Sequence, residues 1–312
     1  MSELVRPDGL RPSFISRLKW ILWGAVEGGL LTAFAFFIIF ADGEDRLFKE
    51  LVANVTTPAM SREEQAIALL HAAHDLLRPR HAVFNAPEES LGLREQYLRS
   101  SGFELNAPRG ACGSFSTVLC RSLQIAGFRA RLVQMKVGAV WAGHVVVEAE
   151  VEPGCWAVLD PTYDLSFVRP DGELAGANDV HKDWAFYRHQ VPNEYDSRYA
   201  YDELRYTNWN KIPVLMPALR WVIVITCGEQ FASVLSIRAC FLNLFRVYAW
   251  SSLVLAILPA GFVLAQSTLR HRRPGSKVET ASNPRAPADA GMALRSDECA
   301  RAKKTAESNV AR

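Results

Sequence analysis

Two long apolar runs bracket the central part of this chain. Residues 20–41 contain one charged residue, Glu27, and residues 247–269 contain none. Each run is long enough to cross the hydrocarbon core of a bilayer as a helix. The sequence therefore predicts two transmembrane helices, and any water-soluble domain has to fold from the residues between them.

The charges that flank the two runs predict how the chain is oriented. Basic residues precede the first run, acidic residues follow it, and basic residues follow the second run: Arg6, Arg11, Arg17 and Lys19; Asp42, Glu44 and Asp45; Arg270, Arg272, Arg273 and Lys277. Cytoplasmic flanks are enriched in Lys and Arg. Residues 1–19 and 270–312 are therefore expected in the cytoplasm, with residues 42–210 outside the cytoplasmic membrane, on the periplasmic side. The first run lacks a convincing cleavage site, which favours an anchor over a removed signal peptide.

Residues 211–246 are apolar but interrupted by Arg220, Glu229 and Arg238, which lie nine residues apart. This spacing places successive charges on opposite faces of a continuous helix, so one amphipathic helix is not expected. A third transmembrane helix would place the basic tail outside. We therefore expect two short interfacial helices or a re-entrant hairpin. The tail, residues 270–312, has almost no large apolar residue and is predicted to be disordered.

The central segment contains both helix and strand patterns. A capping box at Ser61 and Glu64 predicts a helix to about residue 77, and residues 87–100 are typical of a second, short helix. Apolar residues at helical spacing follow Cys112 and stop at Gly127. The remaining segments alternate as strands over residues 129–137, 144–151 and 156–159, with a turn at Pro153-Gly154. The pattern predicts an α+β domain, and residues 162–210 are expected to form a loop-rich extension that lines a cleft or covers an edge.

Three residues in this segment carry the chemistry of an activated thiol. Cys112 lies at the predicted helix start, between Gly110 and Gly113, where backbone N–H groups and the helix dipole favour a thiolate. His144 and Asp160 lie on neighbouring predicted strands, and an antiparallel hairpin would bring them together. In such a trio the thiolate attacks, the imidazole transfers the proton and the carboxylate orients the imidazole.

Each of these residues alone has a simpler interpretation. A lone cysteine at a helix start is usually a small buried hydrophobe, and an Asp-Pro pair usually begins a turn. The common order, the glycine setting and the strand pairing favour the catalytic interpretation for Cys112, His144 and Asp160. Two other cysteines are interpreted as structural, Cys120 as part of the core and Cys155 as partly exposed beside the hairpin turn.

Four short motifs resemble the transglutaminase-like superfamily of cysteine enzymes over roughly residues 60–165. They are Gly110-Ala-Cys112 before a helix, Ala126-Gly-Phe-Arg-Ala-Arg131 after it, His144 with Glu148 on a strand, and Trp156-x-x-Leu-Asp160-Pro-Thr162. The resemblance implies a papain-like arrangement, with the nucleophile helix packed on an antiparallel sheet and a catalytic triad of Cys112, His144 and Asp160. The chain departs from the family pattern at Val146, where an aromatic residue often lies and is expected to shape the acyl-acceptor side.

The resemblance also implies a reaction class. The family includes amidases, proteases, transamidases and inactive modules. The first expectation is a membrane-anchored enzyme that forms a thioester on Cys112 from a peptide or protein amide and releases it to water. The alternatives are transamidation, and a non-catalytic binding or assembly module of a cell-envelope or surface-polymer system. The mechanism needs no metal or organic cofactor.

The overall composition limits the classes of partner that the chain is expected to bind. The chain has 35 basic and 33 acidic residues, so nothing favours nucleic-acid binding. Its six cysteines have no paired spacing, which argues against a disulfide scaffold. His71 and His74 lie three apart on a predicted helix, but they lack a third clear ligand, so no metal site is predicted. The expected partners are the membrane, an amide substrate and other envelope proteins.

Overall fold

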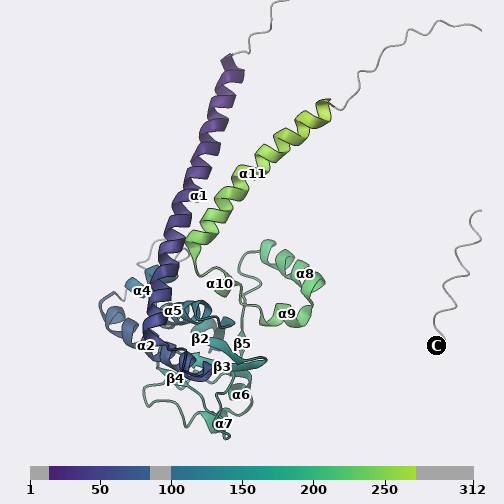
Figure 1. Cartoon of the computed structure of the whole chain (residues 1–312). Helices are drawn as coiled ribbons and strands as arrows, with labels where there is room; N and C mark the ends of the chain where they lie inside the picture. The colour runs from purple at the N-terminus through teal and green to yellow at the C-terminus, as the bar shows by residue number, and fades with distance from the viewer. Residues whose placement is uncertain (1–13, 85–99, 272–312) are drawn as a thin grey trace, which may run out of the picture. The chain divides into compact units, whose positions relative to one another are not determined.

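The computed structural model describes residues 14–84 and 100–271 and confirms the α+β class (Figure 1). The helices are α1 (Phe14–Val55), α2 (Arg62–Phe84), α4 (Ser101–Asn106), α5 (Ala111–Ile125), α6 (Ala177–Lys182), α7 (Trp184–Tyr187), α8 (Leu215–Cys227), α9 (Glu229–Val234), α10 (Ile237–Cys240) and α11 (Leu244–His271). The strands are β1 (Ala130–Val137), β2 (Val140–Glu152), β3 (Cys155–Asp160), β4 (Leu165–Ser166) and β5 (Leu204–Arg205). The helix predicted near residues 87–100 and the predicted disordered tail fall almost entirely outside the described residues.

The five strands form one antiparallel sheet in the order β4-β3-β2-β1-β5. A two-residue turn at residues 138–139 joins β1 to β2, and Val137 pairs with Val140. Strand β2 therefore begins at Val140, and the prediction that His144 opens this strand is wrong. The predicted turn between β2 and β3 is present, and Gly154 adopts the left-handed conformation it requires, with φ of 83°.

Helix α5 begins and ends close to its predicted limits. Its C-terminus is closed by Gly127, whose φ is 82°, and by a hydrogen bond of 2.9 Å from the Phe128 N–H to the Leu123 carbonyl. This is the bond pattern that satisfies the last free carbonyls of a helix. The hydroxyl of Ser116 donates to the Val145 carbonyl at 2.6 Å and attaches the helix to β2.

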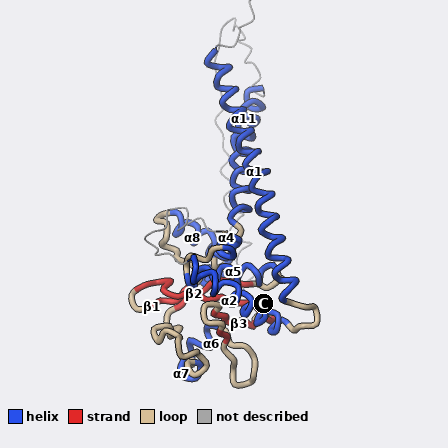
Figure 2. The backbone as a smooth tube through the Cα atoms, turned by 90° about the vertical axis from the view of Figure 1, so that its left-hand side faces the viewer, coloured by secondary structure: helices blue, strands red, loops and turns tan. Residues whose placement is uncertain are grey.

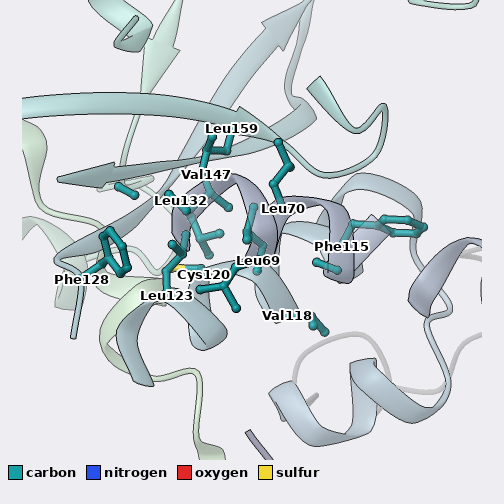
Figure 3. Packing of buried hydrophobic residues seen from close by; sticks show 14 of the residues in the cluster. Leu69, Leu70, Phe115, Val118, Cys120, Leu123, Phe128, Leu132, Val147 and Leu159 are labelled. Carbon is teal, nitrogen blue, oxygen red and sulfur yellow. The ribbon is translucent and has the colours of Figure 1, made fainter. Parts of the chain in front are cut away.

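The sheet has two buried faces, because successive residues of a strand point to opposite sides. The α5 face packs on α2 and α5, and its cluster includes Leu69, Leu70, Leu119, Leu123, Leu132, Val147, Ala157 and Leu159 (Figure 3). The outer face packs on the segment that follows β3, and its cluster includes Val133, Met135, Val146, Val158, Leu165, Phe167, Tyr187, Tyr195 and Tyr201. The loop-rich extension predicted over residues 162–210 supplies much of this second cluster.

Helix α2 begins as its capping box predicts. The Ser61 N–H donates to the Glu64 carboxylate at 2.6 Å, and the Glu64 N–H donates to the Ser61 hydroxyl at 3.2 Å. The helix then continues past residue 77, through Pro79, to Phe84.

The first turns of α11 lie beside the middle of α1 (Figure 2). Ring contacts join them in three pairs, which are Phe34 with Trp250, Phe37 with Tyr248, and Phe40 with Phe245. Residues Arg17–Val55 of α1 are long and apolar enough to cross a membrane by length and composition, and Leu244–Pro259 forms a shorter apolar stretch. Helix α1 does not end where the predicted span ends. It continues into the domain, where Ala41 and Phe48 are buried.

Residues 211–246 contain three short helices and the start of α11, where the sequence predicted two short helices or a re-entrant hairpin. Helix α8 ends at Gly228, whose φ of 89° reverses the chain into α9. The Arg220 guanidinium forms an ion pair with the Glu229 carboxylate across this turn. Helix α8 has no buried residue, and Trp221 and Ile225 are among its exposed apolar side chains.

Candidate active site

Cys112 lies in the first turn of α5, half-buried against the α5 face cluster. The residue before the helix is Gly110, which has no side chain to cap the helix, and its own N–H donates to the Ser114 hydroxyl at 3.0 Å. The first N–H groups of a helix have no intrahelical partner. Those of the first turn are therefore left to a bound anion or to an oxygen that gains negative charge, next to the sulfur.

His144 and Asp160 form a buried pair on the outer face of the sheet. The His144 Nε2 donates to the Asp160 Oδ2 at 2.6 Å, and the two side chains are 1% and 0% exposed. In the register between β2 and β3, Val147 lies opposite Leu159, so His144 is diagonal to Asp160 and on the same face. The hairpin that the sequence predicted brings the two residues together despite the earlier start of β2.

The pKa of His144 reports the balance of forces on the ring. Burial by itself lowers this pKa. The charge of Asp160 and its hydrogen bond outweigh burial, and a hydrogen bond and charge from Cys112 add to them, so the pKa of His144 is raised to about 10. Since Nε2 is occupied by Asp160, Nδ1 is the nitrogen that faces Cys112. The groups on the two sides of the ring, Asp160 and Cys112, therefore both favour its protonated form.

Three tyrosines from the segment after β3 enclose the imidazole. Tyr199 stacks on the His144 ring with 4.2 Å between centroids and 8° between planes. Tyr163 and Tyr195 contact the same ring at 6.0 Å and 6.4 Å. Burial, followed by the charges of Tyr163 and Cys112, raises the pKa of Tyr199 to about 12. The tyrosines are therefore neutral at ordinary pH and keep bulk water away from the ring.

Histidines of α2 hold the turn that follows Asp160. The His74 Nδ1 donates to the Pro161 carbonyl at 3.0 Å, and the His71 Nδ1 donates to the Asp164 carboxylate at 2.7 Å. Asp164 has a φ of 53°, which is uncommon for a residue with a side chain. His71 and His74, which the sequence did not predict to bind a metal, thus support the backbone next to Asp160.

Two further cysteines and Val146 differ in how far they are buried. Cys120 is fully buried, and burial raises the pKa of its thiol to about 12, so it belongs to the core as predicted. Cys155 is exposed. Val146 is fully buried in the outer face cluster. Its influence on the acceptor side stays a prediction.

The family comparison agrees with this geometry. Residues 49–161 match the model of the transglutaminase-like superfamily. The chain contains a transglutaminase-like domain. The matched segment runs from the last turns of α1 to Pro161, and it includes Cys112, His144 and Asp160. No curated protein and no solved structure matches the chain.

The transglutaminase-like domain thus has the predicted fold, and it brings the three predicted residues together. Their catalytic roles stay a prediction. Sequence reasoning missed Tyr199 and the supporting role of His74. The signal for the first was the density of tyrosines between residues 195 and 206, and the signal for the second was the pair of histidines on one face of α2.

Proposed function

We propose that the chain is a membrane-anchored thiol enzyme that cleaves an amide or peptide bond through a thioester on Cys112. The observation that carries the proposal is the buried His144–Asp160 pair, whose free ring nitrogen faces a thiol at an uncapped helix start. A core histidine needs only one satisfied partner. His144 also has a second partner, the thiol at the start of α5. General acid–base and nucleophilic catalysis require this placement of an imidazole next to a thiol.

Acylation would begin from a thiolate and an imidazolium. The Cys112 sulfur attacks the substrate carbonyl carbon, and the carbonyl oxygen gains negative charge beside the free N–H groups of the first turn of α5. His144 Nδ1–H then donates its proton to the amide nitrogen. The C–N bond breaks, the amine leaves, and the acyl group remains on the sulfur as a thioester.

Deacylation would reverse the roles of the imidazole. Neutral His144 removes a proton from water as the water oxygen attacks the thioester carbonyl. The C–S bond breaks, the acid leaves, and the thiolate and imidazolium are restored. Asp160 keeps its charge throughout and holds the ring in one orientation. In serine proteases the Nδ1 of the histidine bonds the carboxylate and Nε2 faces the nucleophile. Here the two nitrogens have the opposite roles, because Nε2 bonds Asp160.

Hydrolysis is favoured over transfer to a large amine. The acceptor must approach the nitrogen of His144 that faces the thioester, but this ring is 1% exposed and is stacked by Tyr199. Water fits such a site more easily than the side chain of a protein amine. Transamidation remains the alternative reaction, and a non-catalytic assembly module is the alternative of a different class.

The membrane part of the proposal rests on α1 and α11. We infer that both cross the bilayer, with both termini in the cytoplasm and the transglutaminase-like domain on the outer side, because basic residues flank the far ends of both helices. The exposed apolar side chains of α8 favour a position in the membrane interface. A reporter that fluoresces only in the cytoplasm should be bright when fused after Arg312 and dark when inserted beside Asp171. The opposite pattern would exclude this topology.

Competitive labelling of the cysteines tests the activated thiol. The intact protein would be treated with iodoacetamide near neutral pH, and the modified cysteines would be identified by peptide mass spectrometry. Accessibility alone predicts that exposed Cys155 reacts before half-buried Cys112. We expect the reverse order, because the protonated ring of His144 beside Cys112 stabilises its thiolate, which is the form that reacts with iodoacetamide.

The control variant is His144→Ala. It should slow the labelling of Cys112 and leave the labelling of Cys155 unchanged. If Cys112 reacts more slowly than Cys155 in the folded wild-type protein, the non-catalytic module becomes the better interpretation. An amide-mimic electrophile that modifies Cys112 alone would support acyl chemistry over general thiol reactivity.

A further inference from the structure

A second site of distinct chemistry lies where α11 meets the transglutaminase-like domain. A cavity of about 500 Å³ is bounded by α5, by the segment after α10, and by the first turns of α11. The lining is polar where α5 and the start of α11 contribute Arg121, Gln124 and Arg246, and apolar farther along α11 at Trp250 and Val254. The candidate active site contributes none of these residues.

At the polar end, the positive charges of two arginines exceed the negative charge that is paired with them. The Asp45 carboxylate receives both guanidinium groups, Arg121 at Oδ1 and Arg246 at Oδ2, and the Asn243 amide donates to it at 2.9 Å. One carboxylate therefore faces two cations. The Nε of Arg121 is buried and has no hydrogen-bond partner among the described residues, and the side chain of Arg246 is 54% exposed. An added anion would supply the missing acceptor and the missing charge.

The apolar end continues along one face of α11. Val247, Trp250 and Val254 line the cavity at helical spacing, one turn after another from Arg246. Trp250 and Val254 are 55% and 50% exposed. A cation followed by a tryptophan and then by aliphatic side chains is the order in which a membrane interface passes into hydrocarbon.

We propose that this cavity binds one anionic phospholipid, with its phosphate at Arg121 and Arg246 and an acyl chain along Trp250 and Val254. The proposal rests on membrane insertion of α1 and α11 and not on the thiol chemistry. A guanidinium group matches the geometry of a phosphate, and a net positive pocket disfavours a head group that carries its own cation. Arg121 lies on α5, nine residues after Cys112, so the bound lipid would contact the helix that carries the nucleophile.

Competition between two lipids with identical acyl chains tests the proposal. The full-length protein in detergent would be mixed with equal amounts of phosphatidylglycerol and phosphatidylcholine, and bound lipids would be counted by native mass spectrometry. We expect a preference for phosphatidylglycerol of about tenfold, because both lipids offer a phosphate but only phosphatidylcholine brings a cation that the net positive pocket repels. Arg246→Gln should abolish the preference and Arg246→Lys should retain part of it. In both variants Arg121 still pairs with Asp45, which favours folding.

The matched control is Arg46→Gln. Arg46 also lies on the domain end of an apolar helix and pairs with Asp42 at 2.8 Å, but it lies outside the cavity. This variant should keep the wild-type preference. Equal binding of the two lipids to the wild-type protein, or equal losses in the Arg46 and Arg246 variants, would overturn the proposal. Competition by glycerol phosphate at the lipid concentration would also overturn it, because an isolated head group lacks the acyl chain. A protein that stays soluble without detergent would instead refute the membrane anchoring.

Discussion

The two faces of the central sheet use alternate residues of the same strand for opposite purposes. On the α5 face, Val145, Val147, Ala149 and Val151 of β2 pack into an apolar cluster. On the outer face, the neighbouring positions include His144 and Glu148, both of which are buried. The period of two along a strand thus separates a packing surface from a polar surface that is equally hidden from water.

The outer face tolerates buried charge because each charged group has a partner. The Glu148 carboxylate accepts from Arg131 at 2.8 Å, from the Tyr206 hydroxyl at 2.8 Å and from the Ala177 N–H at 3.0 Å. His144 has Asp160 and the three tyrosines. A buried charge without such partners costs several kcal/mol. Cys112 comes from α5, on the other side of the sheet, so the candidate site forms where the start of α5 meets the outer face.

The largest expected effect is on the outer face, at Asp160. Asp160→Asn keeps the size of the side chain but removes the charge that holds His144 as a cation. We expect a loss of kcat/KM on the order of 10²–10⁴-fold, as for orienting carboxylates in related triads. Single-turnover acylation by a reactive ester measures it. Full acylation activity in a folded variant would assign the orienting role to another group, with Asp164 the nearest alternative.

The same variant should change how stability depends on pH. The pKa of His144 is raised from 6.5 to about 10, so its contribution to the free energy of unfolding is fully present below about pH 6.5 and is lost as pH rises through 10. Chemical denaturation of wild type and Asp160→Asn should therefore differ most near pH 6, on the order of a few kcal/mol, and least near pH 10. A difference that does not vary with pH would show that the pair is not ionised.

Substitutions on the α5 face should lower the free energy of unfolding and leave the reactivity of Cys112 unchanged. Leu123→Ala removes a fully buried side chain and is expected to cost about 2–5 kcal/mol of unfolding free energy, independent of pH. Leu47→Ala, at an exposed position, should cost much less. Urea denaturation at pH 6 and pH 9 measures both. If folded Leu123→Ala labels at Cys112 as fast as wild type, the two faces are separable, whereas a large loss of labelling would show that they are coupled.

Substitution of Tyr199 tests whether the ring stacked on His144 limits the access of reagents to that histidine. At pH 9, where part of His144 is neutral and can react, Tyr199→Ala should expose the ring and increase its modification by diethyl pyrocarbonate by roughly tenfold. Tyr199→Phe keeps the stacked ring and should match wild type. His189 is exposed and serves as an internal reference in the same sample. Equal modification of His144 in all three proteins would show that Tyr199 does not limit access.

The smallest expected effect is at His74, which supports Asp160 from the α5 side of the domain. His74→Ala removes the hydrogen bond to the Pro161 carbonyl and should cost about 1–3 kcal/mol of stability, because the carbonyl is left without a partner. His71→Ala breaks an exposed pair and should cost under about 1 kcal/mol. Thermal unfolding of the two variants compares them. A larger effect at His71 would mean that Asp164, and not Pro161, holds the turn.

Local signals in the sequence determined the elements that carry Cys112, His144 and Asp160. The capping box of α2, the glycine stop of α5, the turn at Gly154 and the order Cys112–His144–Asp160 each depend on neighbouring residues, whose backbone preferences can be followed along the chain. The alternation of strand residues also predicted that β2 and β3 pair as a hairpin. This pairing is sufficient to place a histidine and a carboxylate on one face.

The tertiary structure decided everything that joins distant segments. The sequence did not indicate that Tyr199 covers His144, that His74 holds the turn after Asp160, or that Asp45 of α1 pairs with Arg121 of α5 and Arg246 of α11. The strand pattern also placed the start of β2 four residues too late. Contacts of this kind depend on how side chains fill the space between elements, and no spacing along the chain encodes them.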